Sequence, residues 1–397
     1  MGKINKTGSS QDKAGSVVRP ASVRKFPLRV VKREHMNPWI QLIYYVVAVI
    51  IALCLGALLL AAMGVSPIEY YEKMVTIGAM GNKFAYKKFE GLIITFIPLV
   101  ITSLALSLSF RMKFWNIGGE GQFIVGAISS AWFALMWGNT LPGWMMILVM
   151  ALGGGICAGI YGLVAGVLKV KFGTNETLMT LMMNYIALYT LRFFGETKAD
   201  WNIFVDPSSD RPKFMELPEA AAMPVIKIGK FSLNIALIVA VLLTIFIIIY
   251  LTRTKHGYEL SVVGDSIPTA RYAGMKVGRI MLRTVFLSAF LIGIAGAFTV
   301  SSSSPPILST AITNDVGWTG IIVAWLSKLN PIAIFIVSAL ISVLQFGCIS
   351  ANASFGAIDS NFADILQGII LFVVLAVDFL IRFKIVRVRN IEKEAQK

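Results

Sequence analysis

Apolar runs of about 20 residues recur along the chain and limit the folds that it can adopt. The first of them, Ile40 to Ala62, contains no charged residue. A helix of about 20 residues rises about 30 Å, which matches the hydrocarbon thickness of a bilayer. Only 14% of the 397 residues are charged, whereas soluble domains average about 25%. The sequence therefore predicts an all-α integral membrane protein, a polytopic bundle of helices.

Ten segments are candidate membrane spans. They are, approximately, 39–63, 91–110, 117–137, 144–168, 177–194, 231–252, 283–300, 317–327, 331–348 and 362–381. The first is too long for a cleaved signal core, so it is expected to remain as an anchor. The segment 317–327 would rise only about 16 Å. We expect it to tilt into a thinned region or to be half of a broken helix. If 317–348 is a re-entrant hairpin, eight spans result.

The distribution of Lys and Arg predicts the orientation of these spans. Most of the 36 basic residues fall in alternate connections and in the two tails, and short cytoplasmic loops are enriched in such residues. We therefore expect a basic cytoplasmic tail over 1–38, a membrane domain over 39–381 and a cytoplasmic tail over 382–397. The net charge of +15 then indicates contact with membrane lipid and no nucleic acid, because no basic stretch is interleaved with exposed aromatic residues.

The cytoplasmic segment 253–283 is too polar for lipid and too long for a simple turn. Within it, Glu259 to Val263 predicts one short helix, with Gly264 as its C-terminal stop. An ordinary amphipathic surface helix is the alternative.

A second short helix is predicted directly after the first. Asp265 or Ser266 can cap it, Pro268 suits its first turn and Gly274 closes it. Two short helices separated by a glycine would form a rigid projection, which we call the knob. Such a projection suits insertion into a groove on a cytoplasmic partner.

Polar side chains at the starts of two spans and one aromatic residue are candidates to line a translocation path. Ionisable and amide groups in spans usually face a cavity or the bundle interior, and aromatic rings provide stacking faces. The candidates are Asn116, Glu120, Gln122, Asn175, Glu176, Asn184 and Trp318. For Asn184 the alternative is a link between helices, and for Trp318 it is core filling.

Several of these stretches resemble one family. The run HGYELSVVGDSIPTARYAGM (256–275) is similar to the coupling loop of ABC importer permeases of the branched-chain amino acid, ribose and nucleoside type. FWNIGGEGQ (114–122), GTNETLMTLMMNYIALY (173–189) and GWTGIIVAWLSKLNP (317–331) are similar to other marks of that family. The greatest similarity is to the nucleoside and simple-sugar permeases. The chain departs from the pattern at Trp115 and at the pair Asp265 and Ser266.

The resemblance implies a permease subunit that translocates a nucleoside across the cytoplasmic membrane. It implies three partners: a cytoplasmic ABC ATPase that carries ATP, a second related permease or a second copy, and an extracytoplasmic substrate-binding lipoprotein. The residues expected to couple to the ATPase are Gly257, Tyr258, Glu259, Gly264, Asp265, Ala270, Arg271 and Gly274. We expect no cofactor or metal on this chain and no ATPase activity, because the phosphate-loop pattern G-x4-G-K-[ST] does not occur in it.

Other functions remain open at this point. A simple-sugar permease would carry the same motifs. An ion-coupled secondary transporter would need a carboxylate within the membrane, for which Asp364 and Asp378 are candidates. A membrane enzyme is disfavoured, because no catalytic constellation is visible. The long connection 195–230, with four prolines, is either a solvated connector or a docking surface for the binding protein.

Overall fold

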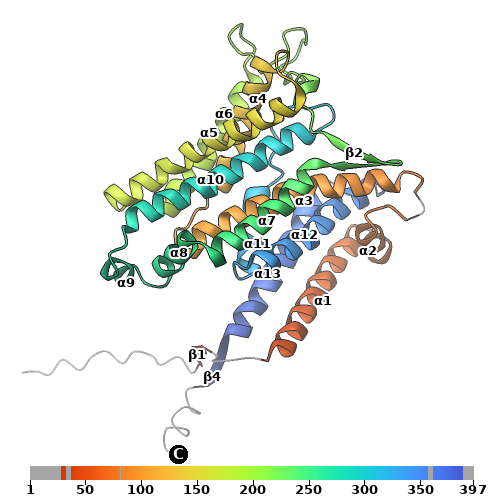
Figure 1. Ribbon diagram of the computed structural model, residues 1–397. Helices are drawn as coiled ribbons and strands as arrows, with labels where there is room; N and C mark the ends of the chain where they lie inside the picture. Colours follow the sequence, from red (N-terminus) through yellow and green to blue (C-terminus); the bar gives the residue numbers. More distant parts are fainter. Residues whose placement is uncertain (1–27, 33–36, 81, 356–360, 388–397) are drawn as a thin grey trace, which may run out of the picture. The chain divides into compact units, whose positions relative to one another are not determined.

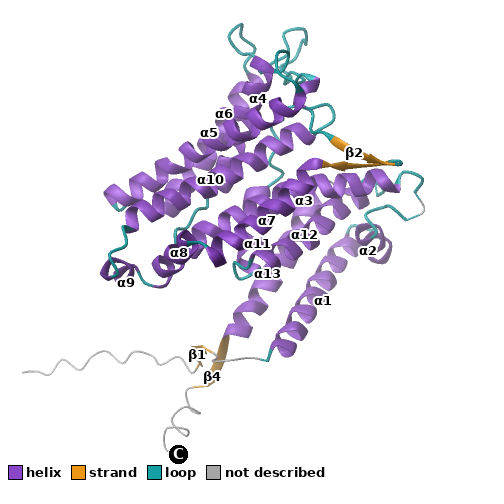
Figure 2. Cartoon of the chain, viewed as in Figure 1, coloured by secondary structure: helices purple, strands orange, loops and turns teal. Residues whose placement is uncertain are grey.

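The computed structural model describes residues 28–32, 37–80, 82–355 and 361–387. The expected tails, 1–38 and 382–397, fall largely outside the described residues. Most described residues are helical, which confirms the predicted helical class (Figures 1 and 2). The helices are α1 (Pro38–Ala62), α2 (Pro67–Val75), α3 (Ala85–Arg111), α4 (Gly119–Trp137), α5 (Gly143–Phe172), α6 (Glu176–Glu196), the 3-10 helix η1 (Glu219–Ala221), α7 (Ile235–Arg253), α8 (Lys255–Asp265), α9 (Ile267–Tyr272), α10 (Val277–Ser302), α11 (Val316–Leu326), α12 (Pro331–Asn352) and α13 (Asn361–Arg382).

Helices α1, α3, α5, α7, α10 and α12 are long and apolar enough to cross a membrane. Helices α4 and α6 have 19 and 21 residues, and α11 has 11. Each of the ten expected spans coincides with a helix. The structure therefore has the form of a polytopic helical membrane protein, while the count of ten spans stays a prediction.

Several expected span boundaries were wrong; α3, for example, begins at Ala85 and not at 91. Residues 231–234 are strand β3 and not the start of a span, because the side chain of Asn234 accepts a hydrogen bond from the Ala236 N–H and so starts α7 only at Ile235. Helix α10 begins at Val277, six residues before the expected 283. Its first residues include apolar ones that continue the helix without a break.

Helices α3, α4, α5 and α10 form the core of the main compact unit, Val49–Leu375. The backbones approach closely where glycines face one another. A Cβ built on Gly126 of α4 would collide with the backbone of Gly293 in α10. Gly155 and Gly159 of α5 lie under the rings of α10 phenylalanines, and Gly162 lies against Ala289. The glycine spacing in α5 therefore serves helix packing, as its sequence pattern indicates.

A second compact unit contains the described residues before Val49 and after Leu375. In it, β1 (Leu28–Lys32) pairs antiparallel with β4 (Phe383–Arg387). The Tyr45 hydroxyl donates a hydrogen bond to Asp378 at 2.6 Å, and the side chain of Asp364 lies outside the described residues. Both strands lie within the expected tails, 1–38 and 382–397, for which no strand was predicted. The pairing therefore joins the segment before α1 to the segment after α13.

The connection between α6 and α7 contains a hairpin that sequence patterns did not reveal. Strand β2 (Val225–Ile228) pairs with β3 (Phe231–Asn234) across a two-residue turn. Gly229 has a φ of +64° there, a conformation that glycine adopts without a steric penalty. Backbone hydrogen bonds therefore order part of this connection. Neither of the two interpretations of 195–230, a solvated connector or a docking surface, predicted a hairpin there.

Candidate functional site

The first helix of the knob, α8, begins at a local cap. The Thr254 hydroxyl accepts a hydrogen bond from the Gly257 N–H at 3.2 Å, and the helix continues to Asp265. The expectation that Gly264 stops this helix was wrong, because Gly264 lies inside it and is buried. A Cβ at this position would collide with the carbonyl oxygen of Arg111 at the end of α3. Gly264 therefore permits close contact between the knob and α3.

The second helix of the knob, α9, has the caps that its sequence predicts. The Ser266 hydroxyl accepts from the Thr269 N–H at 3.3 Å, and a proline lies in the first turn. Gly274 follows the helix with a φ of +74°, and the Met275 N–H donates to the Ala270 carbonyl at 3.0 Å. This is the left-handed glycine termination that local sequence encodes.

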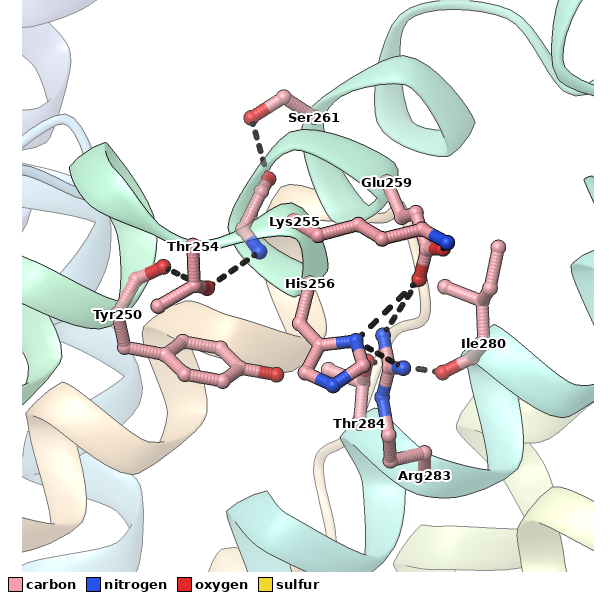
Figure 3. Close-up of polar contacts among 10 residues, drawn as sticks. Tyr250, Thr254, Lys255, His256, Glu259, Ser261, Ile280, Arg283 and Thr284 are labelled. Atoms are coloured by element: carbon pink, nitrogen blue, oxygen red, sulfur yellow. Dashed lines mark hydrogen bonds and ion pairs between the residues drawn. The ribbon is translucent and has the colours of Figure 1, made fainter.

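An ionic cluster joins the knob to α10 (Figure 3). Arg283 of α10 donates a hydrogen bond from Nη2 to Oε2 of Glu259 at 3.0 Å, and its Nη1 also contacts Nδ1 of His256. Nζ of Lys255 lies 4.0 Å from the other carboxylate oxygen. Slight burial raises the pKa of the Glu259 carboxyl, but Arg283 and His256 lower that pKa by more, so it lies below its ordinary value. Glu259 is therefore a charged link between α8 and α10.

The expected coupling residues divide into two groups by exposure. Gly257, Gly264 and Ala270 are buried and shape the knob. A Cβ at Gly257 would collide with the backbone carbonyls at the end of α7. Tyr258 and Arg271 are exposed and could touch a partner.

The first group of expected path residues lies around the start of α4: Asn116 precedes the helix, and Gln122 is in its first turn. The side-chain amides of Asn116 and Gln122 pair with each other through two hydrogen bonds of 3.1 Å. Asn184 of α6 accepts from the Gly121 N–H at 2.8 Å and donates to the Ile117 carbonyl at 2.9 Å. Both polar ends of Asn184 thus hold α6 to the start of α4. That it lines the path stays a prediction.

Glu120 caps the short helix α11. Its side chain is buried, and Oε2 accepts a hydrogen bond from the Gly317 N–H at 2.8 Å. Asp315, at the N-cap position, has a φ of +56° and no side-chain cap, so the cap comes from α4. A Cβ on Gly317 would collide with the backbone of Glu120. A carboxylate at a helix N-terminus satisfies an N–H group and interacts favourably with the helix dipole.

The remaining expected path residues lie apart from this contact. Asn175 is the N-cap of α6, accepting from the N–H groups of Thr177 and Leu178. Glu176 forms an ion pair of 2.7 Å with Lys169. Trp318 of α11 is 38% exposed. That it lines a path remains a prediction.

Sequence reasoning missed an aromatic face on α6. Tyr185, Tyr189 and Phe193 recur every four residues and, with Met182 and Ile186, border a groove of about 620 Å³. Helix α6 contacts α4 and α5 on its other side, so Tyr185 is 50% and Tyr189 60% exposed. The spacing of the three rings was the signal that could have revealed this surface, which we call the α6 aromatic face.

Among the described residues there is no group of three or more His, Cys, Asp or Glu side chains able to hold a metal.

Comparisons with known proteins agree with this architecture. The family model of the branched-chain amino acid transport system permease component matches residues 88–375. NupB of Lactococcus lactis, a nucleoside ABC transporter permease protein, is 29% identical over 76% of this chain and 82% of its own. NupP of Bacillus subtilis, a guanosine ABC transporter permease protein, is 27% identical over 86% and 95%. TsgB13 of Haloferax volcanii, a glucose ABC transporter permease protein, is 24% identical over 90% and 93%.

These matches and the six long apolar helices identify a multi-pass protein of the cell membrane. The relatives are permease components of transporters and not catalytic enzymes. The family model covers most of the chain, including α4, the knob and α11. The chain therefore belongs to the family of branched-chain amino acid transport system permease components.

Proposed function

We propose that this chain is the membrane-spanning permease subunit of an ATP-driven importer and that it carries a nucleoside. The names of two relatives, which describe nucleoside and guanosine permeases, support this substrate class. The glucose permease relative has a lower identity, and it keeps a simple sugar as the second candidate. ATP binds to a separate cytoplasmic subunit, and this chain itself binds no cofactor.

The anchored knob is the observation that carries the proposal. Its two helices are capped at defined residues, and Glu259 joins them to Arg283 of α10. Helix α10 in turn packs along α3, α4 and α5. A displacement of the knob by a partner is therefore passed to the core of the bundle. An ATPase that closes on ATP would supply such a displacement, with Tyr258 and Asp265 as exposed contact residues.

The α6 aromatic face supplies a path for a solute with a flat base. Helix α6 is outside the set of helices apolar enough to be spans by hydropathy, and it exposes two tyrosines along one side. Tyrosine hydroxyls facing lipid tails lack hydrogen-bond partners. Along a path, the rings of this face can stack on a base, and the tyrosine hydroxyls can reach water or solute. A second permease, identical or related, would close this path from the other side.

The remaining partners and the orientation complete the proposal. An extracytoplasmic lipoprotein delivers the nucleoside to the side of the hairpin β2–β3. Ten spans with both ends in the cytoplasm are supported by the positive-inside pattern. The pairing of β1 with β4, which flank the first and last helices, also favours an even number of spans.

Uptake measurements test the substrate. Cells with and without this chain are supplied with labelled uridine, adenosine, guanosine, ribose or glucose. We expect the chain to be required for nucleoside uptake, and the uptake to survive collapse of the ion gradients while ATP remains. If cells without the chain lose ribose or glucose uptake but keep nucleoside uptake, the substrate is a sugar and not a nucleoside. Uptake that follows the ion gradients would identify a secondary transporter.

The α6 aromatic face yields a second prediction. Tyr189→Ala removes a stacking ring, and base–aromatic stacking is worth about 1–3 kcal/mol. We expect nucleoside uptake at subsaturating concentration to fall by about tenfold, the factor for ~1.4 kcal/mol. Tyr189→Phe keeps the ring and should retain uptake. Wild-type uptake in Tyr189→Ala would show that the ring does not line the path. An equal loss in both variants would assign the effect to the hydroxyl and not to stacking.

A further inference from the structure

A cationic pocket lies where α5, α9 and α10 meet. Its volume is about 590 Å³, and it is lined by the basic side chains of Lys169, Arg271, Lys276 and Arg279 together with apolar ones. None of the lining side chains is acidic. Lys169 is paired with Glu176. The other three cations form no ion pair within the described part of the chain. Lys276 and Arg279 also line a neighbouring pocket that includes Glu259.

The pocket lies where two spanning helices end. Lys169 belongs to the last turn of α5, and Arg279 belongs to the first turn of α10. Both helices are long and apolar enough to cross the membrane. Figure 1 shows these two helix ends side by side, with α9 beyond them. The last residue of α5, Phe172, is exposed and follows the lining residue Val170 by two positions. If α5 and α10 cross the membrane, these ends lie at the depth of the lipid headgroups, and the positive-inside pattern places them in the cytoplasmic leaflet.

The order of side chains along α10 matches the order of groups in a phospholipid. Lys276 and Arg279 come first, and the apolar Met281 and Leu282 of the same lining follow further into the span. Charged groups therefore lie at the mouth, with apolar groups deeper along the helix. A soluble anion would contact only the cationic pair, Lys276 and Arg279. A phospholipid would contact that pair and also the apolar pair, Met281 and Leu282.

The start of α10 adds to the attraction for a phosphate. Lys276 occupies the N-cap position, and no side chain caps the first turn. The N–H groups there carry partial positive charge. The three cations supply most of the attraction for a phosphate, and the helix end adds to it.

We propose that the cationic pocket binds the phosphate of an anionic phospholipid from the cytoplasmic leaflet. The phosphate lies between Arg271 of α9 and Lys276 and Arg279 at the start of α10. Its acyl chains lie along Met281 and Leu282. The bound lipid bridges the second helix of the knob to the ends of α5 and α10, which makes the position of the knob sensitive to the lipid composition of the membrane. The proposal requires neither a nucleoside nor an ATPase.

Lipid titration of the purified full-length chain tests the site. The chain in neutral detergent is titrated with phosphatidylglycerol or phosphatidylcholine, and bound lipid is counted by native mass spectrometry. Lys276→Gln/Arg279→Gln is compared with Lys171→Gln/Arg253→Gln, a control pair of exposed basic residues outside the pocket lining. Thermal unfolding of both variants verifies their fold. Phosphatidylglycerol should bind the pocket variant about thirtyfold more weakly, the factor for ~1 kcal/mol per removed cation. The control pair should bind it like the wild type.

Three results would overturn the proposal. Equal loss in both variants would mean diffuse attraction to the basic surface. Displacement of phosphatidylglycerol by excess inorganic phosphate would mean a site for soluble anions. Unchanged lipid binding in the pocket variant, with loss of ATPase co-purification, would mean a protein docking surface. Arg271→Gln, placed on the exposed side of α9, should weaken phosphatidylglycerol binding on its own, and its failure to do so would remove α9 from the site.

Discussion

Gly264→Val is expected to abolish transport while the chain remains in the membrane. Gly264 lies inside α8, and any Cβ there would collide with the carbonyl oxygen of Arg111. The obstacle is backbone and not a flexible side chain, so it cannot rotate away. The knob must instead separate from the end of α3, which would break its rigid connection to the bundle. Nucleoside uptake by cells, together with the amount of chain in the membrane fraction, measures the result.

Gly274→Ala provides the matched control. Gly274 also lies in the knob, but an added Cβ there meets no atom within 4 Å, and only its φ of +74° is unfavourable. A left-handed residue other than glycine costs about 1–2 kcal/mol. We therefore expect a partial loss of uptake for Gly274→Ala and a complete loss for Gly264→Val. Wild-type uptake and intact ATPase co-purification in Gly264→Val would reject the close contact as a requirement for coupling.

Local signals predicted much of the fold. Apolar length placed each expected span on a helix, and the caps of α9 were predicted at Ser266 and Gly274. These features depend on residues a few positions apart, so one sequence contains the whole signal. The errors occurred where a residue was interpreted from its sequence neighbours although its decisive contact is with a distant segment. The glycine after Val263 looked like a helix stop, whereas its partner is Arg111, far away in the chain.

The candidate site was predicted less completely, because its contacts join distant segments. The motif around Glu120 and Gln122 was singled out as a candidate, but its hydrogen-bond partners in α6 and α11 were not predicted. No periodicity in the sequence indicates that Asn184 binds backbone groups at the start of α4. The α6 aromatic face was missed for a different reason. Its spacing is visible, yet only packing shows which side of α6 is covered.

Glu120→Ala is expected to destabilise α11 and to abolish transport. The variant removes the carboxylate that accepts from the Gly317 N–H, and a buried N–H without an acceptor costs about 1–3 kcal/mol. Loss of the favourable interaction with the helix dipole adds to this cost. Trp318 follows Gly317 directly, so fraying of this turn also moves the ring that is expected to line the path. The thermal unfolding temperature of the purified chain and nucleoside uptake report the two effects.

Glu120→Gln separates the hydrogen bond from the charge. Glutamine keeps an oxygen that can accept from the Gly317 N–H but has no charge for the helix dipole. If the hydrogen bond dominates, Glu120→Gln should unfold close to the wild-type temperature and retain uptake. If the charge dominates, it should resemble Glu120→Ala. Wild-type stability and uptake in Glu120→Ala itself would mean that α11 forms without this cap. The start of α11 would then depend on its packing against α3 and α12, which line its other sides.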